Sequence, residues 1–233
     1  MTPSRRPARP RRLRIYRVVV GLLDAILGLT ARRDYRIPPL PRTGPLLVAP
    51  NHVSMVDPIA VAMAVVRAGR IPRFVITAEV MDLPVVGPVL RYFDHVALDR
   101  TRPLDPAVLE PVRRSLRDGE CVVFYPEGAI SKDAGYRPGR ALPGLGRLSI
   151  ELGVPVLPVA QWGAQHVVGR EQLAWLGRPP RRARVTVRGL ALIQPPAEPA
   201  GALNSRRLIN EVMAQITADL ERHLPDAPIS RRS

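Results

Sequence analysis

The 233-residue sequence is poor in cysteine and aromatic residues, and each scarcity excludes a class of protein. Cys121 is the only cysteine, so no disulfide can form within the chain and an oxidising compartment is not indicated. One cysteine and four scattered histidines also fail every spacing of a structural zinc site, so we expect no metal. Aromatic residues make up 4% of the chain, and no basic stretch is interleaved with them. Stacking platforms for single-stranded nucleic acid are therefore not expected.

Two common catalytic signatures are also absent. No Gly-x-Ser-x-Gly segment places a serine nucleophile on a sharp turn between a strand and a helix. No glycine-rich phosphate loop of the P-loop or dinucleotide-binding type is found either. A catalytic base in this chain would therefore activate a hydroxyl group that belongs to the substrate.

Positive charge, in contrast, is abundant and comes almost entirely from arginine. The formal net charge is +15, and Lys132 is the only lysine. Seven arginines precede the first apolar run with no acid among them: Arg5, Arg6, Arg9, Arg11, Arg12, Arg14 and Arg17. Such a segment is typical of a solvated tail, or of a protein that binds an anionic membrane or a nucleic acid.

A helix is expected from Leu13 to Leu29, with apolar residues around most of its circumference. Asp24 interrupts these residues, and the uncharged runs are too short to span a bilayer or to form a signal peptide. Two placements stay open: the helix lies in the membrane interface, or the domain buries it. We favour the interface, because the basic flank supplies a second anchoring signal.

After residue 36, short apolar runs alternate with helical patterns. Strands are expected at 46–50, 73–77, 95–98, 121–125, 154–160 and 183–190, and helices near 58–68, 84–92, 106–117, 144–152 and 203–223. This alternation predicts an α/β fold with a largely parallel sheet flanked by helices, preceded by the amphipathic N-terminal helix. We expect a basic tail and helix over 1–36, one domain over 37–225, and a disordered tail over 226–233.

Polar clusters follow three of the expected strands, at the end where α/β proteins gather their ligands. In the first cluster, "NHVSMVDP", His52 lies in a loop, and Asp57 is expected to cap a helix that begins at Pro58. Two interpretations stay open. Asp57 is a helix cap and nothing more, or its carboxylate folds back onto one ring nitrogen of His52. In the second case the other nitrogen can accept a proton near neutral pH.

Four segments in order resemble the glycerolipid acyltransferase family, and most of all its bacterial 1-acyl-sn-glycerol-3-phosphate acyltransferases. "NHVSMVDP" is similar to the first family motif, "HVALDR" to the second, "YPEGAIS" to the third and "VPVLPVA" to the fourth. The resemblance covers about Pro45 to Ala160. It implies transfer of a fatty acyl group from acyl-CoA or acyl carrier protein to a lysophospholipid, with no cofactor. It also implies a peripheral enzyme on the cytoplasmic face of the cell membrane.

The resemblance assigns roles to individual residues. His52 would be the general base, and Asp57 would hold its ring and stabilise the imidazolium. Substrate binding would involve Asn51, Arg100, Glu127, Gly128 and Ser131. Arg100 would bind the acceptor's phosphate, a task that guanidinium geometry suits, and its strand is expected to deliver it beside the His52 loop.

The sequence departs from the family pattern in two motifs. The second motif has His95 and Ala97 where a glycine and an aromatic residue are usual, and the third has Ala129 and Ile130 in place of Thr and Arg. The missing arginine removes one phosphate contact. Its substitute is sought among Lys132, Arg137, Arg140 and Arg147. A glycolipid or another alcohol as acceptor therefore stays open, as do a non-catalytic relative that binds anionic lipid and a nucleic-acid binder.

Overall fold

The structure is a computed structural model that describes residues 10–99, 106–133, 135–168 and 183–223. Its helices are α1 Pro10–Thr30, α2 Asp57–Arg67, α3 Ala78–Met81, α4 Val86–Tyr92, η1 Pro106–Leu109, α5 Glu110–Arg117, α6 Gly144–Leu152, η2 Ala164–His166 and α7 Ala202–His223. Its strands are β1 Ala31–Arg36, β2 Leu46–Pro50, β3 Pro72–Thr77, β4 Val96–Leu98, β5 Cys121–Val123, β6 Val156–Trp162 and β7 Ala183–Gly189.

These strands form one sheet in the order β1-β7-β6-β2-β5-β3-β4. Every neighbouring pair is parallel except β6 and β7, so β1 and β7 run against the other strands. The central strand β2 is buried along its whole length, as expected for an apolar run covered by helices on both sides. The predicted α/β fold with a largely parallel sheet is therefore confirmed.

Strand β1 was not predicted from the sequence. Its residues, "ARRDYR", are mostly charged and resemble a linker, yet they pair in register with β7 from Ala31–Ala183 to Arg36–Arg188. The strand lies at the edge of the sheet, where charged side chains are tolerated because they reach solvent. Residues 31–36 thus belong to the sheet, and the proposed division at residue 36 stays a prediction.

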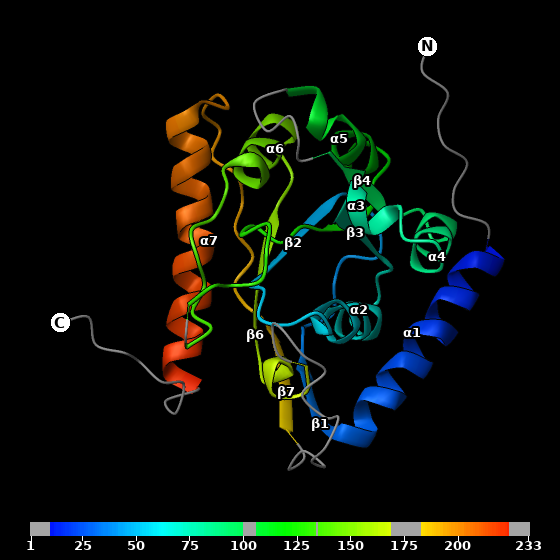
Figure 1. Cartoon of the computed structure of the whole chain (residues 1–233). Helices are drawn as coiled ribbons and strands as arrows, with labels where there is room; N and C mark the ends of the chain where they lie inside the picture. The colour runs from blue at the N-terminus through cyan, green and yellow to red at the C-terminus, as the bar shows by residue number, and fades with distance from the viewer. Residues whose placement is uncertain (1–9, 100–105, 134, 169–182, 224–233) are drawn as a thin grey trace.

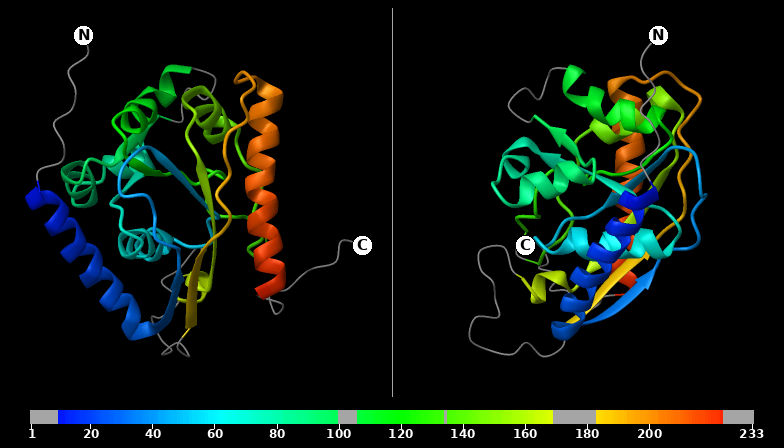
Figure 2. Two further views of the ribbon diagram at one scale, coloured as in Figure 1. Left: turned by 180° about the vertical axis from the view of Figure 1, so that it is seen from behind. Right: turned by 90° about the vertical axis from the view of Figure 1, so that its right-hand side faces the viewer.

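Helices cover the two sides of the sheet in two layers (Figures 1 and 2). Helix α1 packs on α2 on one side, while α7 packs on α6 and β6 on the other. Each side has its own hydrophobic core, one including Val20, Val61 and Val159, the other including Leu148, Val156 and Ile209. The loops that follow β2 and β5 leave the carboxyl end of the sheet, because these two neighbouring strands are parallel.

Helix α1 is both packed on the domain and apolar on its outer side. Its buried side chains include Asp24, whose carboxylate pairs with Arg33 at 2.8 Å and accepts a hydrogen bond from Tyr35 Oη at 2.7 Å. This bonding explains the acid that interrupts the apolar sequence, because a buried charge needs partners. The exposed apolar residues of the helix are Val18, Leu22, Leu23, Ile26 and Leu29.

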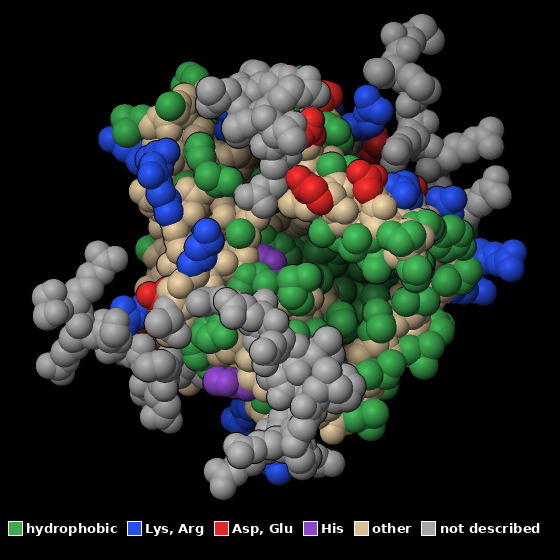
Figure 3. Space-filling model, in the orientation of Figure 1, with side chains coloured by type: hydrophobic (Ala, Val, Ile, Leu, Met, Phe, Trp, Pro, Cys, Tyr) green, Lys and Arg blue, Asp and Glu red, His purple; other side chains and the backbone are tan. Residues whose placement is uncertain are grey.

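Helix α4 and the turn before it show similar exposed residues. These are Leu83, Val85, Val86, Val89 and Tyr92. Arg12 of α1 joins the two surfaces, since its guanidinium lies 5.1 Å from the centre of the Tyr92 ring and pairs with Asp94 at 3.1 Å. Figure 3 shows hydrophobic side chains around a hollow in the region that α1, α2 and α4 occupy in Figure 1. Within the described ranges, no helix combines the length and hydropathy needed to cross a bilayer.

Candidate active site

The His52 loop begins where β2 ends, and Asn51 fastens it to β6. The Asn51 side chain donates to the Gln161 carbonyl oxygen at 3.1 Å and accepts from the Gln161 backbone N–H at 2.8 Å. Asn51 is fully buried, so its amide serves to fix the loop against the neighbouring strand. The expected contact between Asn51 and a substrate stays a prediction.

His52 and Asp57 are brought together as the family resemblance implied. His52 Nδ1 lies 2.9 Å from Asp57 Oδ2, and the same oxygen accepts hydrogen bonds from the backbone N–H groups of Val53 at 2.6 Å and Ser54 at 2.8 Å. With Nδ1 as the donor to the carboxylate, Nε2 keeps the lone pair that accepts a proton. The pair therefore has the geometry of a general base and its orienting carboxylate.

The prediction that Asp57 caps α2 is wrong. Val56 occupies the N-cap position, and Asp57 is the first helical residue, followed by Pro58. The Asp57 carboxylate points back toward the loop instead of capping the helix, and the N–H groups that it accepts from precede α2. The side chain therefore organises the His52 loop as well as the His52 ring.

Burial governs the electrostatics of the pair. The Asp57 side chain has no exposed surface, and this burial raises the pKa of its carboxyl, while the bonds to His52 and to the loop N–H groups lower it. Among the described residues, no group donates a hydrogen bond to Asp57 Oδ1. His52 keeps 17% of its side-chain surface exposed, so a substrate can reach the ring. Its imidazolium would be stabilised by a carboxylate that solvent does not screen.

Tyr125 is a site residue that the sequence analysis did not single out. Its ring stacks on the His52 ring with centroids 4.3 Å apart and planes inclined by 29°. Burial raises the pKa of the Tyr125 phenol well above its usual value, so the hydroxyl stays protonated. Its place directly before Pro126 and Glu127 in the third motif is the signal that could have identified it.

Glu127 ties two loops together through its carboxylate. Oε1 accepts from the backbone N–H of His52 at 2.8 Å, and Oε2 accepts from that of Gly139 at 2.6 Å. Burial raises the pKa of this carboxyl, and the two N–H groups lower it. The described contacts of Glu127 therefore position the His52 backbone, and its predicted role in acceptor binding is untested.

Gly128 and Ser131 follow Glu127 in the third motif. Gly128 has φ +69°, a left-handed conformation that suits glycine, and Ser131 donates its backbone N–H to the His52 carbonyl oxygen at 2.8 Å. The Ser131 hydroxyl donates to the Arg137 carbonyl oxygen and accepts from the Asp133 N–H at 3.2 Å. Ser131 thus bonds to the His52 backbone, and direct contact of either residue with substrate stays a prediction.

The predicted phosphate ligand, Arg100, lies outside the described residues. The strand before it, β4, is separated from β2 by β5 and β3, so the sheet order does not place the end of β4 next to the His52 loop. Of the possible substitutes, Arg147 pairs with Glu151 on α6 at 2.6 Å, whereas Lys132 and Arg140 are exposed. The described part of the chain holds no group of three or more His, Cys, Asp or Glu side chains arranged to bind a metal.

Comparison with known proteins identifies the family. The family model named Acyltransferase matches residues 32–162, more than half of the chain. The human lysophospholipid acyltransferase LPCAT4 is 33% identical over 122 residues, which cover 49% of this chain and 21% of that protein. A probable 1-acyl-sn-glycerol-3-phosphate acyltransferase of Mycoplasma genitalium is 30% identical over 126 residues, which cover 52% of this chain and 45% of that protein.

A solved structure supports the fold over almost the whole chain. The 1-acyl-sn-glycerophosphate acyltransferase PlsC of Thermotoga maritima superposes with a TM-score of 0.67 at 20% identity, covering 97% of this chain and 86% of that one. The two sequence relatives are matched over less than half of their own lengths. The matched family region contains His52, Asp57 and Glu127 in the arrangement described above. This chain therefore belongs to the acyltransferase family.

Proposed function

We propose that this protein transfers a fatty acyl group from an acyl thioester to the hydroxyl of a lysophospholipid, with 1-acyl-sn-glycerol-3-phosphate as the preferred acceptor and phosphatidate as the product. The observation that supports it most is the 2.9 Å contact between the partly exposed His52 and the buried Asp57. The names of the relatives support the substrate class, since LPCAT4 is called a lysophospholipid acyltransferase and the Mycoplasma protein a probable 1-acyl-sn-glycerol-3-phosphate acyltransferase.

In the proposed reaction, His52 Nε2 takes the proton of the acceptor's hydroxyl as its oxygen attacks the thioester carbonyl carbon. The tetrahedral intermediate then collapses, the C–S bond breaks, and the proton passes from His52 to the leaving thiolate. Asp57 stabilises the imidazolium that exists between these two proton transfers. A neutral imidazole at the start and at the end closes the proton balance.

Direct transfer is favoured over an acyl-enzyme because the serine near His52 is engaged, and the single thiol of the chain is buried away from His52, beside Leu46 at the start of β2. The Ser54 hydroxyl is buried and donates to the Val168 carbonyl oxygen at 2.6 Å. Cys121 is buried in β5, and burial raises the pKa of its thiol to about 12, which suppresses the nucleophilic thiolate. The reaction would need no prosthetic group, because the thioester supplies the activated acyl group.

Membrane association is proposed to occur through the outer side of α1. Five large apolar residues on this helix are exposed, and exposed Arg11, Arg14 and Arg17 near its start favour an anionic surface. The exposed residues of α4 extend the same apolar surface. An enzyme bound in this way to the cytoplasmic face of the membrane would meet lysophospholipid and product where they dissolve.

A radiolabelled transfer assay with a panel of acceptors tests the proposal. The panel contains 1-acyl-sn-glycerol-3-phosphate, lysophosphatidylcholine, monoacylglycerol and a monoacylated glycolipid, each with acyl-CoA and with acyl carrier protein as donor. We expect the phosphate-bearing acceptor to have the highest kcat/KM, and Arg100→Ala to lower that value by about ten- to a hundredfold. Monoacylglycerol should be a poor acceptor and little affected by the substitution.

The replacement of the usual third-motif arginine by Ile130 favours a second candidate, an acceptor without phosphate. Equal loss on phosphorylated and unphosphorylated acceptors in Arg100→Ala would support that candidate. Transfer to none of the four acceptors, with either donor, would refute the proposed function.

A further inference from the structure

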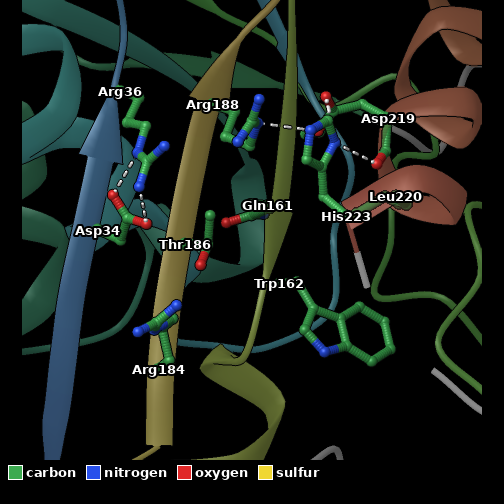
Figure 4. A pocket seen from close by; sticks show the side chains of 11 residues that line it. Asp34, Arg36, Gln161, Trp162, Arg184, Thr186, Arg188, Asp219, Leu220 and His223 are labelled. Carbon is green, nitrogen blue, oxygen red and sulfur yellow. Dashed lines mark hydrogen bonds and ion pairs between the residues drawn. The ribbon is translucent and has the colours of Figure 1, made fainter. Parts of the chain in front are cut away.

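A cavity that does not include the His52 loop lies against the side of the sheet that faces α7. It has a volume of about 220 Å³ and is bordered by strands β1, β7 and β6 and by the last turns of α7 (Figure 4). Its polar lining consists of Asp34, Arg36, Gln161, Arg184, Thr186, Arg188, Asp219 and His223, and Trp162 forms one wall. None of these residues takes part in the proposed proton transfers.

The strand register concentrates arginines on this side of the sheet. Arg32 is paired with Arg184, and Arg36 with Arg188, across the parallel strands β1 and β7. Alternation along each strand puts all four side chains on the side of the sheet that faces away from α1 and α2. Three of these arginines, Arg36, Arg184 and Arg188, line the cavity, and guanidinium groups gathered in this way repel one another unless anionic groups lie between them.

The two acids in the cavity neutralise part of this charge. Asp34 accepts two hydrogen bonds from Arg36, at 2.8 and 3.0 Å, and Asp219 pairs with Arg188 at 3.2 Å and with His223 at 3.1 Å. Within the described ranges, no carboxylate pairs with Arg184, which is exposed and lines the cavity (Figure 4). The lining thus keeps excess positive charge beside the Thr186 hydroxyl.

The cavity is close to the catalytic loop. Gln161 of β6 bonds to Asn51, the residue before His52, and stands opposite Val187 of β7. Strand β7 is two strand spacings from β2, roughly 10 Å, and Thr186 and Arg188 flank Val187. Trp162 also contacts the ring of Tyr136, in the loop that follows Ser131, with centroids 6.4 Å apart. A ligand in the cavity would therefore need a short extended arm to reach His52.

We infer that this cavity, which we call the arginine pocket, binds the phosphate groups of the acyl-CoA donor while the pantetheine arm runs past Trp162 toward His52. This inference rests on the proposed function and selects its donor. Guanidinium groups pair with phosphate through bidentate charge-assisted hydrogen bonds, and an indole wall suits a nucleobase. The small, concave shape favours a nucleotide over an acidic carrier protein, which would need a broad surface of about 800 Å² on each partner.

A fluorescence titration tests binding without turnover. The chain has two tryptophans, so Trp175→Phe leaves Trp162, in the pocket wall, as the single reporter. Adenosine 3′,5′-bisphosphate, which carries phosphates but no acyl group, should change the Trp162 emission in a saturable way. In this background Arg184→Ala should weaken binding about ten- to a hundredfold, and Arg184→Lys less, because lysine keeps the charge but loses the bidentate geometry. Arg114→Ala, an exposed arginine on α5, is the matched control and should change nothing.

Donor kinetics give a second readout. Arg184→Ala should raise KM for acyl-CoA about tenfold or more and leave KM for the same acyl group on pantetheine, which lacks the phosphates, unchanged. Transfer without any binding of the bisphosphate would overturn the inference and leave the proposed function intact. Binding without transfer would do the reverse. An effect of Arg184→Ala on acyl carrier protein alone, or an equal effect on both small donors, would also overturn it.

Discussion

The carboxyl end of the sheet around His52 and the outer side of α1 and α4 are built in opposite ways. At this end of the sheet, buried polar side chains bond to neighbouring parts of the chain; they belong to Asn51, Asp57 and Ser131. On the outer side, large apolar residues such as Val85 and Ile26 are more than 60% exposed. The polar side chains around His52 thus bond within the fold, whereas the outer side leaves large apolar residues exposed, as is typical of surfaces that bind a partner or a membrane. Substitutions around His52 should therefore lower the rate of acyl transfer, whereas substitutions on the outer side should lower binding to vesicles.

The largest effect is expected from His52→Ala. Loss of a general base lowers kcat by at least about a hundredfold. The fold should survive, because Glu127 and Ser131 bond to the backbone N–H and carbonyl oxygen of His52, which alanine retains. Radiolabelled acyl transfer measures the loss, and thermal unfolding and vesicle sedimentation are the controls. An alanine variant within a few-fold of the wild-type rate would exclude His52 as the base.

Asp57→Asn should have the next largest effect and separates the two tasks of this side chain. The amide oxygen can still accept from the loop N–H groups, but a neutral amide cannot stabilise an imidazolium. We expect kcat to fall about ten- to a hundredfold, the value of one charge-assisted hydrogen bond, with little change in melting temperature. Asp57→Ala should lose stability as well, because the loop loses its acceptor. If Asp57→Asn is fully active, the carboxylate serves the loop alone.

The sequence allowed good predictions where local chemistry sets the structure. Apolar runs predicted six of the strands in the described residues. The spacing from His52 to Asp57 left two interpretations open, and the family resemblance favoured the contact that the structure shows. Strand β1 was missed because its charged residues reach solvent at an edge, and burial is the signal that reveals a strand. The short helix α3 was missed for a similar reason, since four residues are too few to establish a period.

The partners of the site residues were harder to predict because they depend on the order of strands in the sheet. The bonds from Glu127 to His52 and from Asn51 to Gln161 exist because β5 and β6 flank β2. Residues 75 or 110 positions apart in the chain meet only in this order. The resemblance to a family assigned Asn51 and Glu127 to substrate binding, which stays a prediction, and it did not indicate the backbone bonds that they make.

Ile26→Glu tests the other region of the comparison. Ile26 on α1 is 61% exposed and Leu203 on α7 is 64% exposed, so Leu203→Glu is a matched control on the opposite side of the molecule (Figure 1). A charge on the proposed membrane-facing side should lower partition into anionic vesicles about tenfold, equivalent to about 1.4 kcal/mol. Sedimentation measures this partition. Transfer between monomeric short-chain substrates should stay unchanged, and equal loss of partition in both variants would show that α1 is not the membrane surface.

The smallest effect is expected in the pH dependence of stability, and it follows from burial of the Glu127 carboxyl. Burial raises the pKa of the Glu127 carboxyl above its ordinary value of 4.5, so the folded state binds the proton more tightly than the unfolded state. The stability that this provides is fully present below the ordinary pKa and is lost as the pH rises through the raised one. Glu127→Gln removes the titration while keeping the shape of the side chain.

Urea unfolding of both proteins at a series of pH values isolates this term. The free energy of unfolding of the wild type, minus that of Glu127→Gln, should fall as the pH rises from about 4 to 7. A constant offset from the lost acceptor does not alter this trend. Leu203→Glu adds an exposed carboxyl and should show no comparable trend against the wild type. A difference that rises with pH would mean that the N–H groups of His52 and Gly139 lower the pKa of Glu127 more than burial raises it. These two groups would then stabilise the charged Glu127 carboxylate at neutral pH.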